Sequence, residues 1–347
     1  MTTLLDAKEH ILDSKCYNIP SGGNNMITFG PVPSRRLGQS LGINNIPPKV
    51  CTFSCVYCQV GRTLNLQLER QVFYDPEKIL SDVHDKVKKA RKMGETIDYL
   101  SFVPDGEPTL DKNLGRTIEL LRPLEIKIAV ITNGSLIWLE DVREDLMKAD
   151  WVSLKIDSVM EKTWRKINRP QKRLQLDSIL NGMLKFKRNY TGELVTETML
   201  SEGVNDGVDN LTAVADFLSR LQPVKAYLSI PTRPPAEKRI LPPSEEVINR
   251  AYQILNKKLD RVEYLIGYEG NAFAFTGKAE EDLLSITAVH PMREEAVIQL
   301  LSKAKANWSV VRRLIDQAKL IESEYEGQKF YLRRFPRRKQ RALPDTD

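Results

Sequence analysis

The feature that most constrains the fold is a regular alternation of short apolar runs with longer amphipathic stretches between residues 40 and 260. The apolar runs have the length of buried β-strands, and the stretches between them have helical periodicity. Strands that alternate with helices pair in parallel, because each right-handed crossover returns the chain to the same end of the sheet. The expected strands lie at residues 40–47, 97–104, 127–133, 151–157, 194–200 and 225–231.

Six such units predict an α/β domain of the partial (β/α)6 TIM-like barrel type, in which chemistry lies at the carboxyl ends of the strands. One helix is expected to begin after Asp75, because Asp is a good N-cap and Pro76 suits the first turn. The glycine- and proline-rich segment 30–42 is expected to form a loop. Further helices are expected near residues 111–124, 139–149, 158–168, 173–190, 209–222 and 244–259.

The composition changes after about residue 277, where three short helical segments precede two strand-like segments joined by a glycine turn. This order resembles a winged-helix module, whose third helix would carry Asn307, Trp308, Arg312 and Arg313 as the recognition helix. Winged helices bind nucleic acids or serve as protein contacts, and both alternatives stay open. The expected division is an N-terminal extension (1–42), a core (43–276), a winged-helix-like module (277–336) and a basic tail (337–347).

The bulk composition excludes several classes of protein. Hydrophobic residues make up 41% and charged residues 28% of the 347 residues, which argues against extensive disorder. No apolar run approaches the roughly 20 residues that a membrane helix needs, and the N-terminus lacks the pattern of a signal peptide. A cytoplasmic protein without membrane contact is expected. Seven basic residues and no acid lie between Lys329 and Arg341, a run that either faces phosphate or forms a solvated tail.

Three of the four cysteines lie together in the segment VCTFSCVYCQVG, with the spacing C-x3-C-x2-C. Thiolates Cys51, Cys55 and Cys58 could hold three irons of a cubane cluster, which leaves the fourth iron open for another ligand. A zinc site would need a fourth ligand, and a thioredoxin-like pair would leave Cys51 unexplained. Cys16 is distant in sequence and is expected to be a free thiol.

This spacing, placed between a first strand and a series of strand–helix units, resembles the radical SAM superfamily over roughly residues 30–235. The resemblance implies a [4Fe-4S] cluster on Cys51, Cys55 and Cys58, with S-adenosylmethionine chelating the open iron. It further implies that S-adenosylmethionine is cleaved reductively to a 5′-deoxyadenosyl radical, which abstracts hydrogen from a substrate. An electron donor such as flavodoxin or ferredoxin would supply the electron.

Other motifs are similar to the family's cofactor-binding positions. Residues 104–109 resemble its Gly-Gly-Glu-Pro motif, which contacts the methionyl amino group, although Asp105 stands where the first glycine is usual. A carboxylate and backbone carbonyls are suitable acceptors for an ammonium group. The resemblance implies cofactor contacts for Tyr57 near the adenine, for Gly106, Glu107 and Pro108 in that motif, and for Thr132 and Asn133 after the third strand.

The strand at 151–157 alternates so that Ser153, Lys155 and Asp157 share the interior face. An interior lysine needs a counter-charge, which would be either the S-adenosylmethionine carboxylate or a carboxylate of the chain itself. Ser229 on the sixth strand also belongs to the expected cofactor site, whereas the facing of residues 196–198 is ambiguous.

The stretch PVPSRRLG, with Arg35 and Arg36, resembles uncharacterised Fe–S oxidoreductases related to wyosine-type tRNA-modifying enzymes. Those enzymes carry additional N-terminal cluster cysteines, and since this chain has only Cys16 there, no second cluster is expected. RNA or tRNA is one candidate substrate; a peptide, protein or small molecule is another. A DNA-binding Fe–S redox sensor is the non-enzymatic alternative. The sequence predicts neither the product, the fate of S-adenosylmethionine, nor the oligomeric state.

Overall fold

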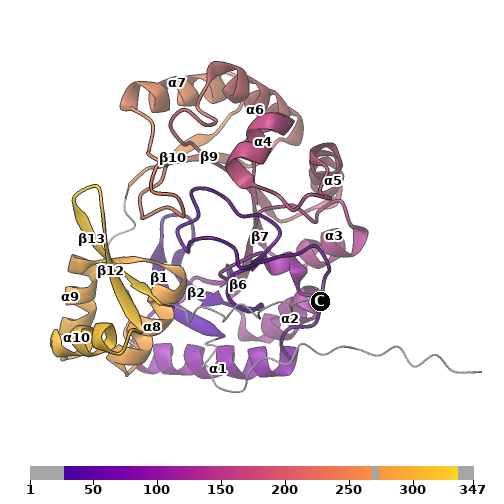
Figure 1. Ribbon diagram of the computed structural model, residues 1–347. Coiled ribbons are helices and arrows are strands. Elements are labelled where there is room, and N and C mark those ends of the chain that lie inside the picture. The colour runs from indigo at the N-terminus through magenta and orange to yellow at the C-terminus, as the bar shows by residue number, and fades with distance from the viewer. Residues whose placement is uncertain (1–26, 268–272, 335–347) are drawn as a thin grey trace, which may run out of the picture.

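The computed structural model describes residues 27–267 and 273–334, so Cys16 and the basic tail lie outside the described residues. Its centre is a sheet in the order β1-β2-β5-β6-β7-β8-β9-β10 (Figure 1). Strand β1 is antiparallel to β2, and all the other neighbours are parallel. The strands are β1 (Thr28–Ser34), β2 (Gly38–Ile43), β5 (Tyr99–Phe102), β6 (Lys127–Thr132), β7 (Trp151–Lys155), β8 (Glu193–Met199), β9 (Lys225–Ser229) and β10 (Val262–Leu265).

The parallel α/β architecture is confirmed, because all six expected strands are present. The expectation of a loop over residues 30–42 was wrong, since this segment forms the β1–β2 hairpin. Proline is tolerated in β1 because β1 is an edge strand. A register shift between Phe29 and Val32 accommodates Gly30, and a Cβ atom on Gly42 would lie only 2.0 Å from the Phe29 ring. Strand β10 was not predicted.

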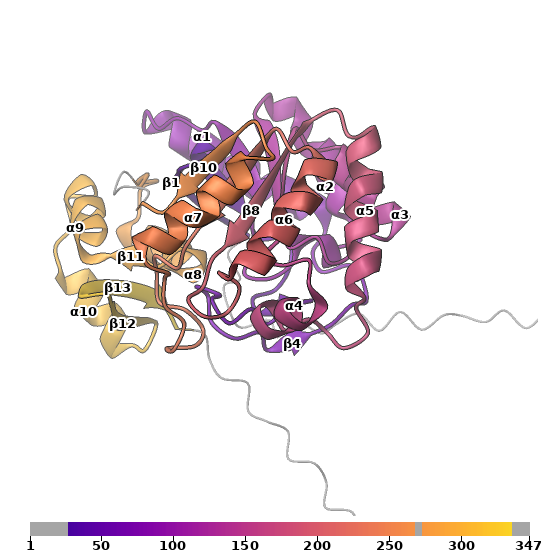
Figure 2. The same ribbon diagram turned by 90° about the horizontal axis from the view of Figure 1, so that it is seen from above.

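Helices cover the outer face of this sheet, as Figures 1 and 2 show. In α1, the Asp75 side chain accepts a hydrogen bond from the Glu77 backbone, and buried apolar side chains recur at helical spacing. Every helix expected between residues 75 and 259 is present. These helices are α1 (Pro76–Lys92), α2 (Leu114–Leu121), α3 (Glu140–Met147), α4 (Glu161–Asn168), α5 (Leu176–Asn189), α6 (Val208–Leu221) and α7 (Glu245–Asn256).

The inner face carries an apolar layer with a polar layer beside it. Trp151, Val195 and Tyr227 belong to one buried apolar cluster, and two residues further along each strand lie Ser153, Glu197 and Ser229. Since side chains alternate along a strand, this offset of two keeps both layers on one face. The sheet edges approach each other in space, because Arg35 of the β1–β2 turn donates to the carbonyls of Leu265 and Gly267 after β10.

The C-terminal elements gather on one side of the molecule, next to β1 (Figures 1 and 2). They share a core with Phe29 and Val32 of β1, which also includes Leu283, Leu300 and Tyr331. Lys86 of α1 pairs with the buried Asp282 at 3.0 Å and so ties this region to the sheet domain. The elements are α8 (Ala279–Val289), β11 (Met292–Arg293), α9 (Glu294–Lys303), α10 (Ser309–Asp316), β12 (Leu320–Tyr325) and β13 (Gln328–Arg333), with the strand order β11-β13-β12.

The residues expected on a recognition helix have mixed roles. Asn307 accepts a hydrogen bond from the Ser309 backbone, and Trp308 packs edge-on against Tyr331. Arg313 is exposed but pairs with Glu280, and Arg312 is exposed. None of the helices in the described ranges is long and apolar enough to cross a membrane.

Candidate cluster and cofactor site

Backbone hydrogen bonds on two sides hold the loop that carries the three cysteines. Strand β3 (Val50–Cys51) pairs with β4 (Asn65–Leu66), and Val50 also bridges to Gly106. On the other side, the Ser54 amide donates to the Asn168 carbonyl at 3.1 Å, and the Val56 amide donates to that of Ile167 at 3.0 Å. The loop is therefore fixed between the chain that follows β5 and the end of α4.

The three thiols are free, half-buried and close enough to influence one another. Burial raises the pKa of each thiol, and the pKa of Cys55 reaches about 12 because Asp157 adds to the effect of burial. The thiolates needed for metal binding thus require nearby cations. Within residues 27–267 and 273–334, no three His, Cys, Asp or Glu side chains are arranged for one metal ion. Cysteine thiolates are the usual ligands of iron–sulfur clusters, whereas a structural zinc site would need a fourth ligand beside the three cysteines.

On one side of the loop, Asn133 reaches Cys51. The Asn133 side-chain amide donates to Cys51 Sγ at 3.6 Å and to Thr52 Oγ1 at 2.8 Å. Glu107 holds Asn133 in place, because its carboxylate accepts from the Asn133 backbone at 2.8 Å and from Thr132 Oγ1 at 2.6 Å. It also accepts from the Thr109 backbone at 3.0 Å. With 1% exposure and both oxygens used, Glu107 would reach a cofactor only by giving up one of these bonds.

The residues next to Glu107 contact the start of the cysteine loop at Val50. A Cβ atom on Gly106 would lie 1.9 Å from the Val50 carbonyl oxygen, so only glycine allows this close approach. Pro108 begins a short 3₁₀ helix, and its carbonyl accepts from Asn45 at 3.0 Å. Asp105, the departure from the family motif, is 4% exposed and lies 3.5 Å from Lys49 Nζ. Burial raises the pKa of Asp105 to about 6, although Lys49 opposes this shift.

On the other side of the loop, Asp157 connects Tyr57 with Asn168. Tyr57 donates to Asp157 Oδ2, as does the Asn168 amide at 2.6 Å. The same amide lies 3.5 Å from Cys55 Sγ. Sequence reasoning missed Asn168, and its one local signal is its place at the end of a helix directly before Arg-Pro.

A chain of buried charges continues into the interior. Lys155 Nζ lies 3.6 Å from Asp157 Oδ1 and 3.1 Å from Glu197 Oε1, so the alternative of an internal ion pair is the one present in this structure. Glu197 also pairs with Arg36 and accepts from Ser229 at 2.8 Å, while Arg36 reaches Ser153 at 3.4 Å.

Mutual attraction keeps these interior groups charged. Burial alone would lower the pKa of Lys155, but Asp157 and Glu197 together raise it above its ordinary value. Burial alone would likewise raise the pKa of Glu197, and Lys155 and Arg36 hold it far below its ordinary value instead. The interior therefore combines two cations and two carboxylates just behind the cysteine loop.

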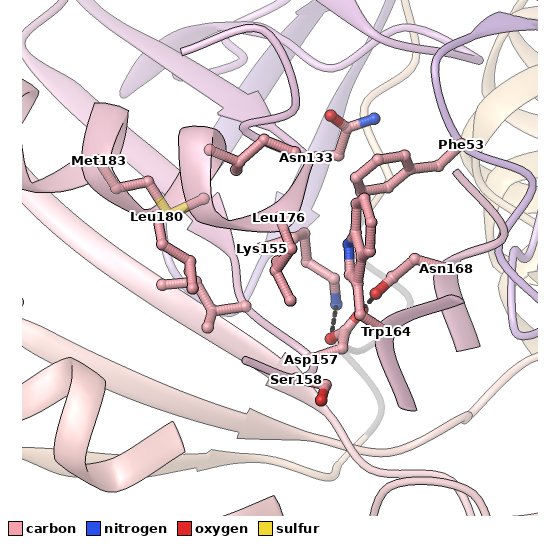
Figure 3. Close-up of a pocket in the computed structure, with 12 residues that line it drawn as sticks. Phe53, Asn133, Lys155, Asp157, Ser158, Trp164, Asn168, Leu176, Leu180 and Met183 are labelled. Atoms are coloured by element: carbon pink, nitrogen blue, oxygen red, sulfur yellow. Dashed lines mark hydrogen bonds and ion pairs between the residues drawn. The ribbon is translucent and has the colours of Figure 1, made fainter. Parts of the chain in front are cut away.

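A pocket opens between this polar group and helix α5 (Figure 3). The predicted residues Asn133, Lys155 and Asp157 line it, with Leu180 and Met183 of α5 on the apolar side. The pocket has one polar and one apolar wall, and its free volume of about 10 Å³ is the space of about one water molecule. Of the other predicted residues, Tyr57 contacts Asp157 from the loop, Ser153 and Ser229 contact the Arg36–Glu197 pair, and Gly106, Glu107, Pro108 and Thr132 lie beneath the loop.

Comparison with known proteins gives consistent matches. The profile of the radical SAM superfamily matches residues 45–215. A UPF0026 protein of Methanocaldococcus jannaschii is 51% identical over 309 residues, which cover 88% of this chain and 96% of that protein. A UPF0026 protein of Synechocystis is 36% identical over 59% of this chain and 76% of that protein.

Among solved structures, a radical SAM methyltransferase from Sphaerobacter thermophilus matches with a TM-score of 0.49 and 18% identity, covering 65% of this chain and 66% of the other. The near full-length match to the M. jannaschii protein and the superfamily profile agree with the cysteine loop described above. The chain is therefore a member of the UPF0026 family and of the radical SAM superfamily, whose enzymes use a [4Fe-4S] cluster and S-adenosylmethionine.

Proposed function

We propose that Cys51, Cys55 and Cys58 bind three irons of the cluster and that S-adenosylmethionine chelates the fourth. When bound and reduced, this cluster supplies the electron that cleaves S-adenosylmethionine to the 5′-deoxyadenosyl radical for hydrogen abstraction. The observation that carries the proposal is the set of three free thiols on one loop, each with a raised pKa, next to a half-polar pocket. A cationic cluster would offset the burial that disfavours the thiolates.

Lys155 in the pocket, the Glu107 motif and Tyr57 of the cysteine loop would divide the binding of S-adenosylmethionine between them. Lys155 would bind its carboxylate, because the ammonium group of a lysine donates charge-assisted hydrogen bonds to carboxylate oxygens. The bound carboxylate would then share Lys155 with Asp157 and Glu197. The methionyl ammonium suits carboxylate and backbone carbonyl oxygens near the Glu107 motif. Tyr57, whose ring lies 4.9 Å from Lys155 Nζ, offers an aromatic face to the adenine.

The chain's own groups also protect the cluster ligands. Asn133 and Asn168 each place a side-chain amide beside a cysteine sulfur, at 3.6 Å and 3.5 Å. Such donors stabilise thiolate charge and fix the direction of each ligand. Three predicted residues act indirectly, by holding other site residues in place. Arg36 donates to Ser153, Ser229 donates to Glu197, and Thr132 donates to Glu107.

We infer that the substrate is an RNA, and tRNA is the first to be tested. The proposal is supported by the element order from α8 to β13, which is the order expected of a winged helix, a module that often binds nucleic acid. It lies near the site, because Gln59 beside Cys58 donates to the Val289 carbonyl at 3.2 Å and Tyr325 of the hairpin donates to Pro231 at 3.3 Å. RNA binding should weaken steeply with salt; binding insensitive to salt would argue for a peptide or a small molecule instead.

Anaerobic reconstitution tests the proposed chemistry. Protein loaded with iron and sulfide should carry about four irons per chain and release 5′-deoxyadenosine with dithionite and S-adenosylmethionine. The variant Cys55→Ala should lose this product and most of the iron. The variant Thr52→Ser keeps all three cysteines and the hydroxyl that accepts from Asn133, and it serves as the loop control. Protein that retains a single zinc after reconstitution, or a Cys55→Ala variant with full activity, would contradict the assignment.

A further inference from the structure

Three arginines from three different segments surround one glutamate beside the cysteine loop. Arg62 Nη2 lies 3.3 Å from Glu237 Oε1, Arg239 Nε lies 3.0 Å from Glu237 Oε2, and Arg169 also pairs with Glu237. Their side chains are 70%, 68% and 38% exposed, whereas that of Glu237 is 9% exposed. One carboxylate cannot neutralise three guanidinium groups, so the cluster presents surplus positive charge to solvent.

Each arginine belongs to a segment hydrogen-bonded to the cysteine loop. The Glu237 amide donates to the Val56 carbonyl at 3.1 Å, and the Ser54 amide donates to the Arg169 carbonyl at 3.2 Å. Arg62 directly follows Gly61, whose amide donates to the Cys58 carbonyl at 3.0 Å. A molecule that docks on these arginines is therefore held against the backbone that carries the cysteines.

The charge in these segments is unusually concentrated. Residues 49–63, 165–173 and 233–239 contain ten lysines and arginines and a single acid, Glu237, a net charge of +9. The whole chain has a net charge of only +6. The remainder of the sequence therefore has a net charge of −3, which is +6 minus +9, and two cations of these segments, Arg165 and Lys49, pair with Glu161 and Asp105 outside them.

The apolar groups of the surface distinguish a protein partner from a nucleic acid. Leu64, two residues after Arg62, is 67% exposed and offers apolar area that a protein partner can bury. Binding of single-stranded RNA relies on exposed aromatic rings. Within the described residues of these three segments, Phe53 is buried and Tyr57 is half-buried against Asp157.

We propose that Arg62, Arg169, Arg239 and Leu64, the docking surface, bind an acidic protein that carries one low-potential electron. The inference rests on the proposed function, which requires a reductant at the cysteine loop. Opposite charge steers such a carrier to the loop, and contact with segments bonded to the loop keeps the transfer distance short. Electron transfer falls off steeply with distance, which is why a docking surface belongs at this place.

The test compares two reductants on the reconstituted protein. Release of 5′-deoxyadenosine is measured with dithionite and with a purified, photoreduced acidic flavodoxin, over a range of salt concentrations. The variant Arg62→Gln/Arg169→Gln/Arg239→Gln should lower the flavodoxin-driven rate roughly tenfold at low salt, mainly through the KM for flavodoxin. The dithionite-driven rate should stay within about twofold, and the difference from wild type should shrink as salt screens the charges.

A matched variant controls for the loss of three charges. Arg116, Arg122 and Arg261 are also exposed arginines paired with acids, and their triple change to glutamine should leave the flavodoxin-driven rate unaltered. If the docking-surface variant loses dithionite-driven activity as well, the single Arg62→Gln variant decides, because Arg62 is the most exposed of the three. It should keep the dithionite rate and lower the flavodoxin rate about twofold or more.

Each remaining outcome is distinct. A wild-type protein that gives no 5′-deoxyadenosine with dithionite overturns the proposed function, and the docking surface falls with it. Equal flavodoxin-driven rates in the wild type and the variants overturn the docking surface alone. Unchanged flavodoxin-driven rates together with weakened, salt-dependent tRNA binding would assign these arginines to RNA.

Discussion

Replacing Glu197 by glutamine isolates the contribution of the interior charges. Glutamine has nearly the same shape, so the change removes a charge and leaves no cavity. In the wild type, Glu197 accepts from Ser229 and pairs with Arg36 and Lys155, all of which are largely buried. The variant leaves Lys155 paired with Asp157, at 3.6 Å, and removes the charge that faces Arg36.

The expected magnitude follows from burial. Removing one partner of a buried ion pair costs about 3–5 kcal/mol, because the other charge stays buried. Lys155 keeps Asp157, and the Lys155 and Arg36 side chains retain 15% and 14% exposure, so the lower end applies. We expect a loss of about 3 kcal/mol, which at a urea slope of about 3 kcal/mol/M lowers the midpoint by about 1 M.

Equilibrium urea unfolding of the metal-free protein at pH 7 measures this loss, and Glu263→Gln is the control. Glu263 also pairs with a lysine, Lys225 at 2.8 Å, but its side chain is 45% exposed. Removal of an exposed pair should cost less than about 1 kcal/mol. Adding Lys155→Met to Glu197→Gln should recover part of the lost stability, since the buried cation that lost its Glu197 partner is then gone.

A midpoint for Glu197→Gln within about 0.2 M of the Glu263→Gln value would refute the reasoning. It would mean that the interior charges are hydrated well enough to lose a partner without penalty. A double variant less stable than the sum of the two single variants would also contradict the assigned pairing.

Three further predictions follow from the same contacts. Asn133→Ala should speed bleaching of the reconstituted cluster in air by roughly tenfold, because Cys51 loses its amide neighbour. The control variant Asn249→Ala, at an exposed residue, should bleach at the wild-type rate. The loss of absorbance near 400 nm measures the bleaching rate of each variant. Gly106→Ala should cost about 3 kcal/mol or more through the clash with the Val50 carbonyl, whereas Gly267→Ala, in open space, should stay within about 0.5 kcal/mol by thermal unfolding. The stability advantage of the wild type over Glu197→Gln should be complete above about pH 4.3 and should decline as the pH falls. The reason is that the pKa of Glu197 is depressed in the folded state but not in the unfolded state. An advantage that grows on acidification would contradict this pH dependence.

The arrangement of strands and helices could be predicted because each element carries a local pattern. The strand at 151–157 alternates clearly, and its side chains Ser153 and Lys155 lie on the inner face as expected. Strand β1 escaped prediction because its glycine and prolines are typical of loops and are tolerated only at a sheet edge. Strand β10 has four residues, and its Glu263 and Tyr264 interrupt the apolar pattern.

The partners within the site could not be predicted, because they depend on contacts across the sheet. Asn168 is more than 100 residues from Cys55 and Tyr57, and no local pattern connects them. Arg36 reaches Glu197, more than 150 residues away, whose facing the sequence left ambiguous. The grouping of Arg62, Arg169 and Arg239 likewise appears only when three separate loops are folded together.

The central claim is that three cysteine thiolates leave one iron available to S-adenosylmethionine. Electron paramagnetic resonance of the dithionite-reduced, reconstituted protein tests it directly, with S-adenosylmethionine labelled by ¹⁵N or ¹⁷O on its amino or carboxylate group. We expect a [4Fe-4S]⁺ signal that changes on addition of the cofactor and shows hyperfine coupling to the label. A cluster signal that S-adenosylmethionine leaves unaltered, with no coupling to the label, would contradict it.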